Sequence, residues 1–387
     1  MRHFAVIGHP IAHSRSPEIH QVFAQQMGIA IAYRRLEAPV VADGSGFADV
    51  TRAFFASGGV GMNVTAPFKE AAFCLASDVS ERSRLAAAAN TLTADGENGW
   101  HADNTDGIGL VRDLTGRLGF PLAGQRLLIL GAGGASAGIL GPLLDARPAQ
   151  IVLWNRSADK ARRLVHRFSD AYPDAALSVV SADIRSHGVF SCNPAALFPA
   201  PLPQARERRS SSAVPQHTGE GRCSSAAPQQ AGAGSCSRPR APLFPPLQEP
   251  AFEELLIGRE GQGGDGAPSP ASRERGNMYS EEMVMDQESF DLVIHATSLK
   301  EGLNTADEAS AAWPWLNSLC APDTFFYDLS YADNEETLFL RWVKARGACR
   351  WSDGFGMLVE QAAESFRIWH DCLPETPPVF AALRLKK

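Results

Sequence analysis

Two polar runs in the first third of the chain carry a lysine and an aspartate that could transfer a proton. Lys69 ends the run that begins at Gly61, and Asp106 lies in the run Asp103-Asn104-Thr105-Asp106-Gly107. A free lysine has a pKa of about 10.4, so a lysine that exchanges protons near neutral pH needs desolvation or a charged neighbour. Asp106 could supply that neighbour and hold the ammonium group. We therefore take Lys69 and Asp106 as a candidate acid–base pair.

A glycine turn follows these runs and indicates a dinucleotide site. The turn Gly131-Ala132-Gly133-Gly134-Ala135 comes after an apolar strand-like segment and opens a helix-like one. In this context Gly131 permits the tight turn, and Gly133 lets the backbone approach a pyrophosphate. The helix that follows offers amide donors and the positive end of its dipole. Ser136 stands where a third glycine or alanine is usual.

The end of the next strand indicates which dinucleotide would bind. An NAD site normally places an acidic residue there to bind the ribose hydroxyls. This chain instead has Asn155 and Arg156, with Lys160 one helical turn further on. A guanidinium group can grip a 2′-phosphate through two hydrogen bonds, whereas a carboxylate would repel it. The expected cofactor is therefore NADP(H).

Short polar residues at turns and strand ends could bind an oxygen-rich small molecule. Ser14 and Ser16 flank Arg15 at a strand-to-helix turn, where two hydroxyls could cradle a carboxylate. Ser16 is also expected to cap the helix that it opens. Further residues of this kind are Asn63, Thr65, Asn90 and Thr91. Turn formation is the alternative explanation for all four.

The surrounding pattern predicts an α/β fold in two parts. In the first hundred residues, strands are expected at 4–7, 31–36 and 60–64, and helices from Ser16 to the cap Gly28 and over 46–56. A second unit begins with a helix over 106–118. Its expected strands lie at 126–130, 151–154, 177–180, 292–294 and 325–327, with helices at 136–145 and 357–370. This alternation favours mostly parallel sheets.

Bulk properties limit the possible functions. The chain has 387 residues, a formal charge of -7 and 44% hydrophobic residues, which suits two globular domains and argues against nucleic-acid binding. The seven cysteines lack metal-ligand spacing and are expected to be reduced thiols. Neither a signal peptide nor a membrane span is expected. We therefore predict a cytoplasmic protein that binds neither metal nor membrane.

Residues 186–288 differ in composition from the rest of the chain. Thirteen of the 26 prolines fall between Pro194 and Pro270, among glycine, serine, alanine and glutamine. Such a segment cannot bury enough apolar surface to offset its ordering entropy, so we predict a disordered insertion. It interrupts the second unit. A role in binding a partner stays open, chiefly through residues 252–257.

Taken in order, these motifs resemble those of the shikimate dehydrogenase family. The resemblance covers residues 1–185 and 289–372. The segments that carry it are Val6–Pro17, Gly61–Lys69, Ala89–Thr91, Asn104–Gly107, Gly131–Ala135, Asn155–Ser157, and Asp353–Leu358 with Gln361–Ala363.

The resemblance implies a function and a role for each matching residue. The reaction would be the reversible, NADPH-dependent reduction of 3-dehydroshikimate to shikimate. Lys69 and Asp106 would be catalytic. Substrate contacts would come from Ser14, Ser16, Thr65, Lys69, Asn90, Asp106, Tyr331 and Gln361. Cofactor contacts would come from Gly131, Ala132, Gly133, Gly134, Ala135, Asn155, Arg156, Ser157, Lys160, Leu329 and Gly354.

The resemblance also implies a domain organisation. Residues 1–105, completed by C-terminal helices in 355–387, would form the substrate domain. Residues 106–354 would form a Rossmann-type NADP-binding domain that carries the insertion 186–288, with the active site in the cleft between the two. A homodimer is left open.

The chain departs from the family pattern at three places, and two rival functions stay open. His295 stands where an asparagine is common, the segment after Tyr331 lacks a usual proline, and the insertion has no counterpart. One rival is a quinate or shikimate dehydrogenase that uses NAD(P). The other is a non-catalytic NADPH-binding or scaffold protein.

Overall fold

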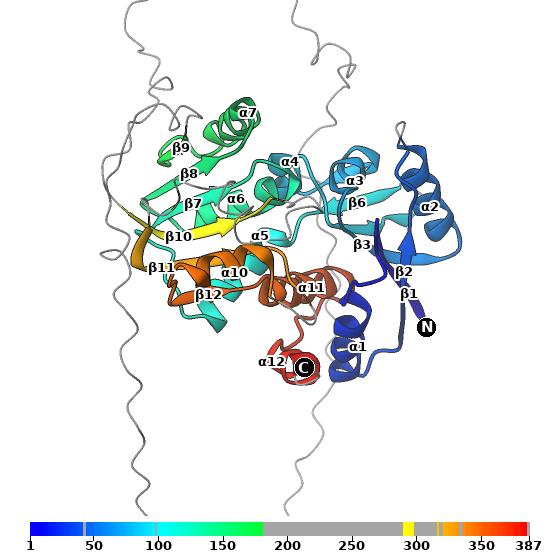
Figure 1. Cartoon of the computed structure of the whole chain (residues 1–387). Helices are drawn as coiled ribbons and strands as arrows, with labels where there is room; N and C mark the ends of the chain where they lie inside the picture. Colours follow the sequence, from blue (N-terminus) through cyan, green and yellow to red (C-terminus); the bar gives the residue numbers. More distant parts are fainter. Residues whose placement is uncertain are drawn as a thin grey trace, which may run out of the picture. The chain divides into compact units, whose positions relative to one another are not determined.

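The computed structural model describes residues 1–41, 44–96, 99–180, 289–297, 316, 320–332 and 336–384. The predicted insertion 186–288 lies outside these residues. All described residues belong to one compact unit. It contains two six-stranded sheets (Figure 1).

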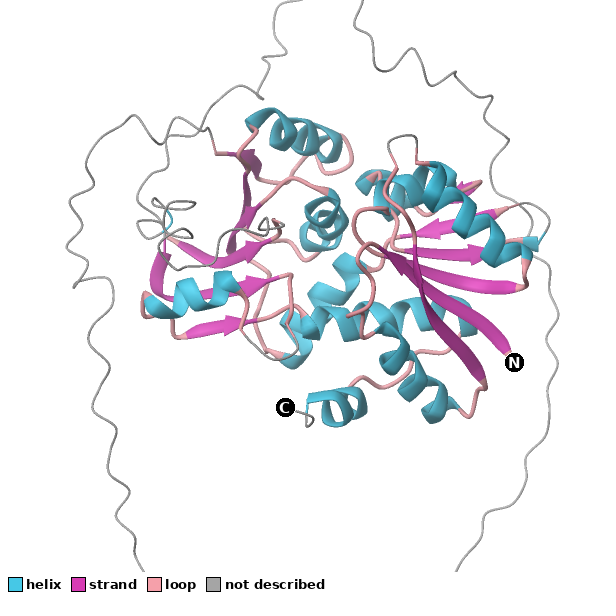
Figure 2. Cartoon of the chain, turned by 45° about the vertical axis from the view of Figure 1, so that its right-hand side comes forward, coloured by secondary structure: helices cyan, strands magenta, loops and turns pink. Residues whose placement is uncertain are grey.

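The first sheet has the strand order β2-β1-β3-β5-β6-β4. Side chains alternate between its two faces, so neighbours such as Phe4 and Ala5 enter different cores. Phe4 packs with apolar residues of α1 and α11, and Ala5 packs with those of α2 and α3. Figure 2 shows the strands of this sheet with helices along both sides. The elements of this part are β1 (Arg2–Gly8), α1 (Ser16–Met27), β2 (Ile31–Glu37), α2 (Ser45–Ala56), β3 (Gly59–Val64), α3 (Lys69–Leu75), β4 (Asp78–Val79), α4 (Glu81–Ala86), β5 (Thr91–Ala94) and β6 (Trp100–Asp103).

Part of this sheet is antiparallel. β1 runs parallel to β2 and β3, as expected, but β5 is antiparallel to both β3 and β6. β5 and β6 have four residues each and mix polar with apolar side chains, so they lack the apolar run that marked the other strands. This hairpin matters for the site because Asn90 directly precedes β5 and Asn104 directly follows β6.

The second sheet is wholly parallel, with the order β12-β11-β10-β7-β8-β9. Numbered from β7 as the first strand, this is the order 3-2-1-4-5-6 of the doubly wound dinucleotide-binding fold. Ligands of that fold bind beyond the carboxyl ends of the two central strands, here β7 and β10. The elements of this part are α5 (Asp106–Arg112), η2 (Asp113–Arg117), β7 (Arg126–Leu130), α6 (Gly134–Asp145), β8 (Gln150–Trp154), α7 (Ala158–Ser169), β9 (Leu177–Val179), β10 (Phe290–His295), β11 (Cys320–Asp328), α10 (Leu338–Ala345) and β12 (Arg350–Ser352). The chain then returns to the first sheet with α11 (Phe355–His370) and α12 (Pro377–Arg384), which share an apolar core with α1.

The prediction that Ser16 caps the first helix is wrong. Helix α1 begins at Ser16 itself, Arg15 holds the N-cap position, and no side chain caps the helix. The Ser14 hydroxyl instead lies 3.4 Å from the Ser16 amide, which leaves the Ser16 hydroxyl for other partners. At the other end, Gly28 ends the helix in the left-handed conformation, as predicted.

The predicted helix over 106–118 is divided into α5 and a π-helical turn, η2. Asp113, the first residue of η2, is fully buried and accepts hydrogen bonds from Arg117 and the Tyr327 hydroxyl. The same hydroxyl accepts a hydrogen bond from the Met357 amide near the start of α11. These bonds connect η2, which directly follows α5, to β11 and to the start of α11.

Helix α5 also makes a very close approach to α11. A Cβ atom at Gly109 would lie 2.6 Å from the backbone nitrogen of Gln361, closer than side chains tolerate. Glycine is therefore needed at this position. The close approach sets the distance between Asp106, at the start of α5, and Gln361 on α11.

The helices of the described residues are α1 to α7, the π-helical turn η2 and α10 to α12. Each of these described helices is too short or too polar to cross a bilayer.

Candidate active site

Lys69 and Asp106, which are 37 residues apart, form an ion pair. The Lys69 Nζ atom lies 2.5 Å from Oδ2 of Asp106. Backbone hydrogen bonds bring their segments together: the Ala89 amide donates to the Lys69 carbonyl, and the Asn90 amide donates to the Asp103 carbonyl. The Asp106 side chain is 6% exposed and that of Lys69 is 20% exposed. The carboxylate is thus buried, while the ammonium group retains access to solvent or to a ligand.

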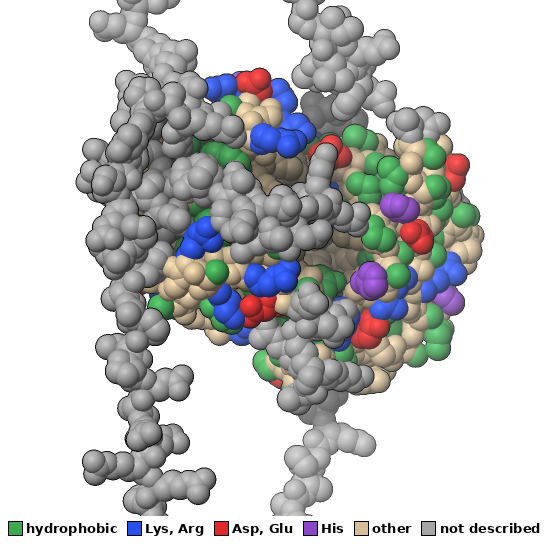
Figure 3. Space-filling model, in the orientation of Figure 1, with side chains coloured by type: hydrophobic (Ala, Val, Ile, Leu, Met, Phe, Trp, Pro, Cys, Tyr) green, Lys and Arg blue, Asp and Glu red, His purple; other side chains and the backbone are tan. Residues whose placement is uncertain are grey.

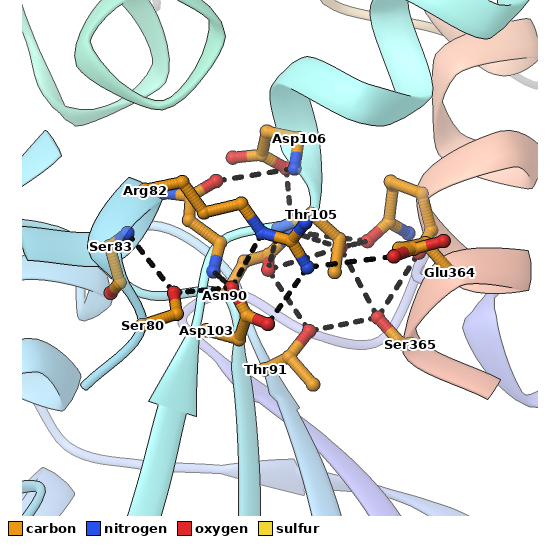
Figure 4. Close-up of polar contacts among 12 residues, drawn as sticks. Ser80, Arg82, Ser83, Asn90, Thr91, Asp103, Thr105, Asp106, Glu364 and Ser365 are labelled. Carbon is orange, nitrogen blue, oxygen red and sulfur yellow. Dashed lines mark hydrogen bonds and ion pairs between the residues drawn. The ribbon is translucent and has the colours of Figure 1, made fainter. Parts of the chain in front are cut away.

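Asn90 joins this pair to the last long helix (Figure 4). Its amide nitrogen lies 2.8 Å from Asp106 Oδ1 and 3.1 Å from Gln361 Oε1. Its oxygen accepts hydrogen bonds from the Thr105 amide and the Thr91 hydroxyl. Because Asp106 uses one oxygen for Lys69 and the other for Asn90, its carboxylate has a fixed orientation. Lys69, Asp106, Asn90 and Gln361 form one hydrogen-bonded cluster.

A second set of bonds extends this cluster into the first sheet. The amide nitrogen of Asn63 donates to the Asn90 carbonyl at 3.3 Å, and its oxygen accepts from the Tyr33 hydroxyl at 2.7 Å. Tyr33 is in turn hydrogen-bonded to Ser16. The Ser14 hydroxyl donates to that of Ser16 at 3.2 Å. The two predicted serines are therefore connected to the Lys69 cluster through Tyr33 and Asn63.

His20 completes this network from the apolar side. Its Nε2 atom lies 3.1 Å from Asn63 Oδ1, which is an acceptor, so Nε2 carries the proton. The ring is buried and stacks on Tyr33, with centroids 4.5 Å apart. Burial lowers the pKa of His20 from 6.5 to about 3, against the opposing effect of the Asn63 hydrogen bond, and nearby His370 lowers it further. His20 is thus a neutral donor that fixes Asn63.

The lowered pKa of His20 predicts acid sensitivity. Below pH 6.5 the unfolded chain binds a proton at His20 that the folded chain does not, so this contribution to stability is complete above that pH. It is lost as the pH falls towards 3. The melting temperature should therefore decline from pH 7 to pH 4, and less steeply in His20→Gln. Replacing the exposed His166 on α7 should leave the slope unchanged, and equal slopes for all three proteins would contradict the assignment.

Of two further predicted substrate residues, Thr65 lies next to this cluster and Tyr331 packs on helix α11. Thr65 follows β3, and its amide donates to the Ile7 carbonyl at 2.9 Å. The preceding amide, of Val64, donates to the Asn90 carbonyl, so Thr65 is one residue from the cluster. Tyr331 follows β11 and packs edge-on against Phe355, the first residue of α11, with ring centroids 6.3 Å apart.

The glycine turn has the features that a bound pyrophosphate requires. Gly131 has a φ of 127°, which side chains other than glycine rarely adopt. A Cβ atom at Gly133 would have no neighbour within 4 Å, so packing within the described structure does not demand glycine there. The open space allows a ligand to reach the backbone. Helix α6 has no side-chain cap, and its first amides are available to an anion.

The predicted phosphate-binding residues lie at the end of β8. The Asn155 side chain donates to the Ser157 carbonyl at 2.8 Å and closes the turn before α7. Arg156 and Lys160 are exposed. Figure 3 shows Lys and Arg side chains gathered over α7, which carries Lys160, Arg162 and Arg163. A 2′-phosphate at this turn would meet the positive charge of Arg156 and Lys160.

Several residues of the network were not among the predicted site residues. The Ser365 hydroxyl lies 2.8 Å from that of Thr91 and 3.0 Å from the Asn63 amide nitrogen. Ser365 lies four residues after Gln361 and therefore on the same helix face, so the sequence alone could have indicated that it belongs to the site. Tyr33 and His20 gave no comparable signal, because only the folded chain brings them to Asn63.

Family models match three segments of the chain. Residues 6–92 match the shikimate dehydrogenase substrate binding domain, and residues 114–195 match shikimate / quinate 5-dehydrogenase. Residues 354–384 match the shikimate 5'-dehydrogenase C-terminal domain. These segments contain most of the residues of the Lys69 network and the glycine turn.

Individual relatives match along nearly the whole chain. A shikimate dehydrogenase (NADP(+)) of Halorhodospira halophila is 36% identical over 383 residues, covering 99% of this chain and 98% of the relative. A protein of the same name from Alkalilimnicola ehrlichii is 36% identical over 381 residues and covers 98% of each chain.

Solved structures share the fold. An Ael1 enzyme from Pseudomonas putida has a TM-score of 0.59 and 29% identity, and the match covers 99% of this chain and 98% of that one. A Thermus thermophilus shikimate 5-dehydrogenase, solved with NADP(H) and shikimate, has a TM-score of 0.58 and 23% identity, and the match covers 100% of both chains. At that identity the second likeness concerns the fold alone.

Proposed function

Because this chain belongs to the shikimate dehydrogenase family, we propose that it catalyses the reversible, NADPH-dependent reduction of 3-dehydroshikimate to shikimate. The observation that carries the proposal is the hydrogen-bonded cluster of Lys69, Asp106, Asn90 and Gln361. In this cluster the proton donor Lys69 is connected to the side-chain amides of Asn90 and Gln361, which can form hydrogen bonds with the hydroxyls of a substrate ring.

NADPH bound at this site would supply a hydride for the C3 carbonyl of the substrate. Lys69 donates a proton to the carbonyl oxygen as it gains negative charge, and takes the proton back in the reverse direction. Asp106 holds the ammonium group through its 2.5 Å contact. Asn90 holds the opposite oxygen of Asp106, which keeps the pair aligned.

The remaining polar residues would bind the substrate. Ser14 and Ser16 would hold its carboxylate, and Thr65, Asn90, Tyr331 and Gln361 would bind its hydroxyls. The network from Ser16 through Tyr33 and Asn63 supports this division, because it connects the serines to the catalytic pair. Residues 1–105, with helices from 355–387, would form the substrate domain, and 106–354 the NADP domain.

The cofactor would lie beyond the carboxyl ends of β7 and β10. Gly131 to Ala135 and the start of α6 would hold the pyrophosphate, and Asn155, Arg156, Ser157 and Lys160 would hold the adenosine end. Leu329 and Gly354 would border the nicotinamide end. The open space at Gly133, the uncapped helix and the exposed Arg156 fit these roles.

Arg156→Ala should reduce the preference for NADP over NAD. Loss of a charge-assisted contact to the 2′-phosphate should raise KM for NADP by about 10- to 100-fold. KM for NAD, which lacks that phosphate, should stay within about twofold. Steady-state kinetics with both cofactors measures this. Arg162→Ala, which removes a neighbouring arginine paired with Asp159, is the control. An unchanged cofactor ratio in Arg156→Ala would refute the phosphate contact.

One assay tests the reaction and its rivals. Shikimate and quinate are each supplied with NADP and with NAD, and the appearance of reduced nicotinamide is followed by absorbance. Among the four combinations, we expect shikimate with NADP to give the highest kcat/KM. Higher values for quinate or NAD would favour the quinate alternative. Binding of NADPH without turnover of either substrate would favour a non-catalytic protein. A cytoplasmic location and a homodimer stay predictions from the sequence.

A further inference from the structure

His295 lies at the centre of the edge where the cofactor is proposed to bind. It is the last residue of β10, its side chain is 1% exposed, and its ring stacks on Phe339 with centroids 4.6 Å apart. Its Nδ1 atom lies 2.9 Å from Asp328 Oδ1, and its Nε2 atom lies 2.6 Å from the Thr297 hydroxyl. Both ring nitrogens are thus engaged, and each connects to a different strand end.

The direction of the bond to Asp328 follows from the chemistry of the carboxylate. A carboxylate can only accept, so the Nδ1 atom of His295 carries a proton. The Nε2 atom shares its hydrogen bond with the Thr297 hydroxyl and so fixes where that hydroxyl points. Asp328 Oδ1 also accepts from the Ser330 amide at 3.0 Å, which holds the segment after β11. One ring therefore orders both segments.

These segments border the residues predicted to contact the cofactor. A Cβ atom at Gly131 would lie 2.9 Å from the Ala296 carbonyl oxygen and 3.1 Å from the Thr297 methyl group. The Leu329 amide donates to the His295 carbonyl at 2.9 Å, and the Gly354 amide donates to the Ser330 carbonyl at 3.0 Å. The glycine turn, Leu329 and Gly354 thus meet around the segments that His295 holds.

From this arrangement we infer that His295 is a positioning residue for NADP(H), which acts through Thr297 and Asp328. β7 and β10 are the central strands of the sheet, where the order reverses and dinucleotides bind. His295 ends one of these strands, and Thr297 packs on the glycine turn that ends the other. The inference rests on the proposed cofactor site, but not on the identity of the substrate.

A double-mutant cycle tests the coupling. His295→Phe keeps a ring against Phe339 and removes both nitrogens, and Thr297→Val keeps the methyl group and removes the hydroxyl. The Kd for NADP is measured by titration calorimetry. Each change should raise Kd, by about tenfold for His295→Phe and about fivefold for Thr297→Val. The double variant should also raise Kd about tenfold, because the Thr297 hydroxyl is no longer held in place once the ring nitrogens of residue 295 are gone. Independent effects would multiply to about fiftyfold.

Kinetic constants and a control variant show whether His295 positions the cofactor or only packs in the core. KM for NADP should rise in His295→Phe, while KM for shikimate changes less than about twofold. His101→Ala removes another histidine–aspartate pair, with Asp78 on the first sheet, and should leave Kd for NADP unchanged. A His295→Phe variant with a lower melting temperature but normal Kd would overturn the inference, as would multiplying effects. If the wild type binds NADP but does not oxidise shikimate, the proposed function fails while the binding cycle still decides the role of His295.

Discussion

Lys69→Ala should lower kcat by about 10²–10⁴-fold, the usual contribution of a positioned acid–base group. KM for shikimate should change much less, because the proton is transferred in the transition state and the other polar residues still bind the substrate. Lys69→Arg should not restore turnover, since a guanidinium group stays protonated. Steady-state kinetics in both directions measures the loss.

Lys344→Ala is a matched control for this experiment. Lys344 also pairs with a carboxylate, that of Glu336, at 2.5 Å, but both groups are more exposed and lie outside the proposed site. Its removal should leave kcat unchanged. Full turnover by Lys69→Ala would remove Lys69 from the mechanism, even if binding of both ligands were normal.

Of the substitutions proposed here, Glu364→Ala should lower the free energy of unfolding the most. Glu364 lies on α11 with a side chain 2% exposed, and it pairs with Arg112 and Arg367 at 2.8 Å and with Arg82 at 3.5 Å. Arg82 also pairs with Asp103 (Figure 4). Removing this buried carboxylate takes a shared partner away from three arginines and leaves Arg82 with Asp103, which should lower the free energy of unfolding by about 3 kcal/mol. Thermal or denaturant unfolding measures the change.

The pH dependence of stability separates the effect of the Glu364 charge from that of its packing. Burial alone would raise the pKa of Glu364, but hydrogen bonds and charges of Arg367 and Arg112 outweigh it and lower the pKa. The stability it contributes is therefore complete above the unfolded pKa of about 4.3 and is lost as the pH falls below that value. Glu364→Gln should resemble the wild type in acid and be less stable at pH 7.

A surface pair gives the comparison for Glu364. Glu81 pairs with Arg84 on α4 at 3.7 Å, and both side chains are exposed. Exposed pairs contribute about 0–1 kcal/mol, so Glu81→Ala should barely shift the unfolding transition. If Glu364→Ala had the same unfolding midpoint as Glu81→Ala, the ion pairs of Glu364 would not be what stabilises the packing of α4, α5 and α11.

The features that sequence could predict are local ones. Gly131 needs a positive φ, Gly28 ends a helix, and the apolar runs of β7 and β8 mark buried strands, so each carries its own signal. The acid–base pair was predicted from residue types and order. Its geometry depends on backbone bonds from Ala89 and Asn90 to segments that lie elsewhere in the chain.

What sequence could not predict depends on long-range contacts. Asn63 and Ser365 are 302 positions apart yet share a hydrogen bond, and no local pattern specifies that pairing. Ser16 looked like a helix cap because its type suits one, but its hydroxyl is connected to Tyr33 in the folded chain. The short strands β5 and β6 gain their stability from pairing with each other and with β3, not from their own composition.

The tight contact between Gly109 and Gln361 has a consequence for engineering new substrates into this scaffold. Any side chain placed at that glycine would push apart the helices that carry Asp106 and Gln361, so mutational searches should find few viable clones there. Thr65 and Tyr331, which follow β3 and β11 and lie outside this helix contact, are the positions to vary instead. Libraries confined to those two positions would leave the contact between α5 and α11 intact.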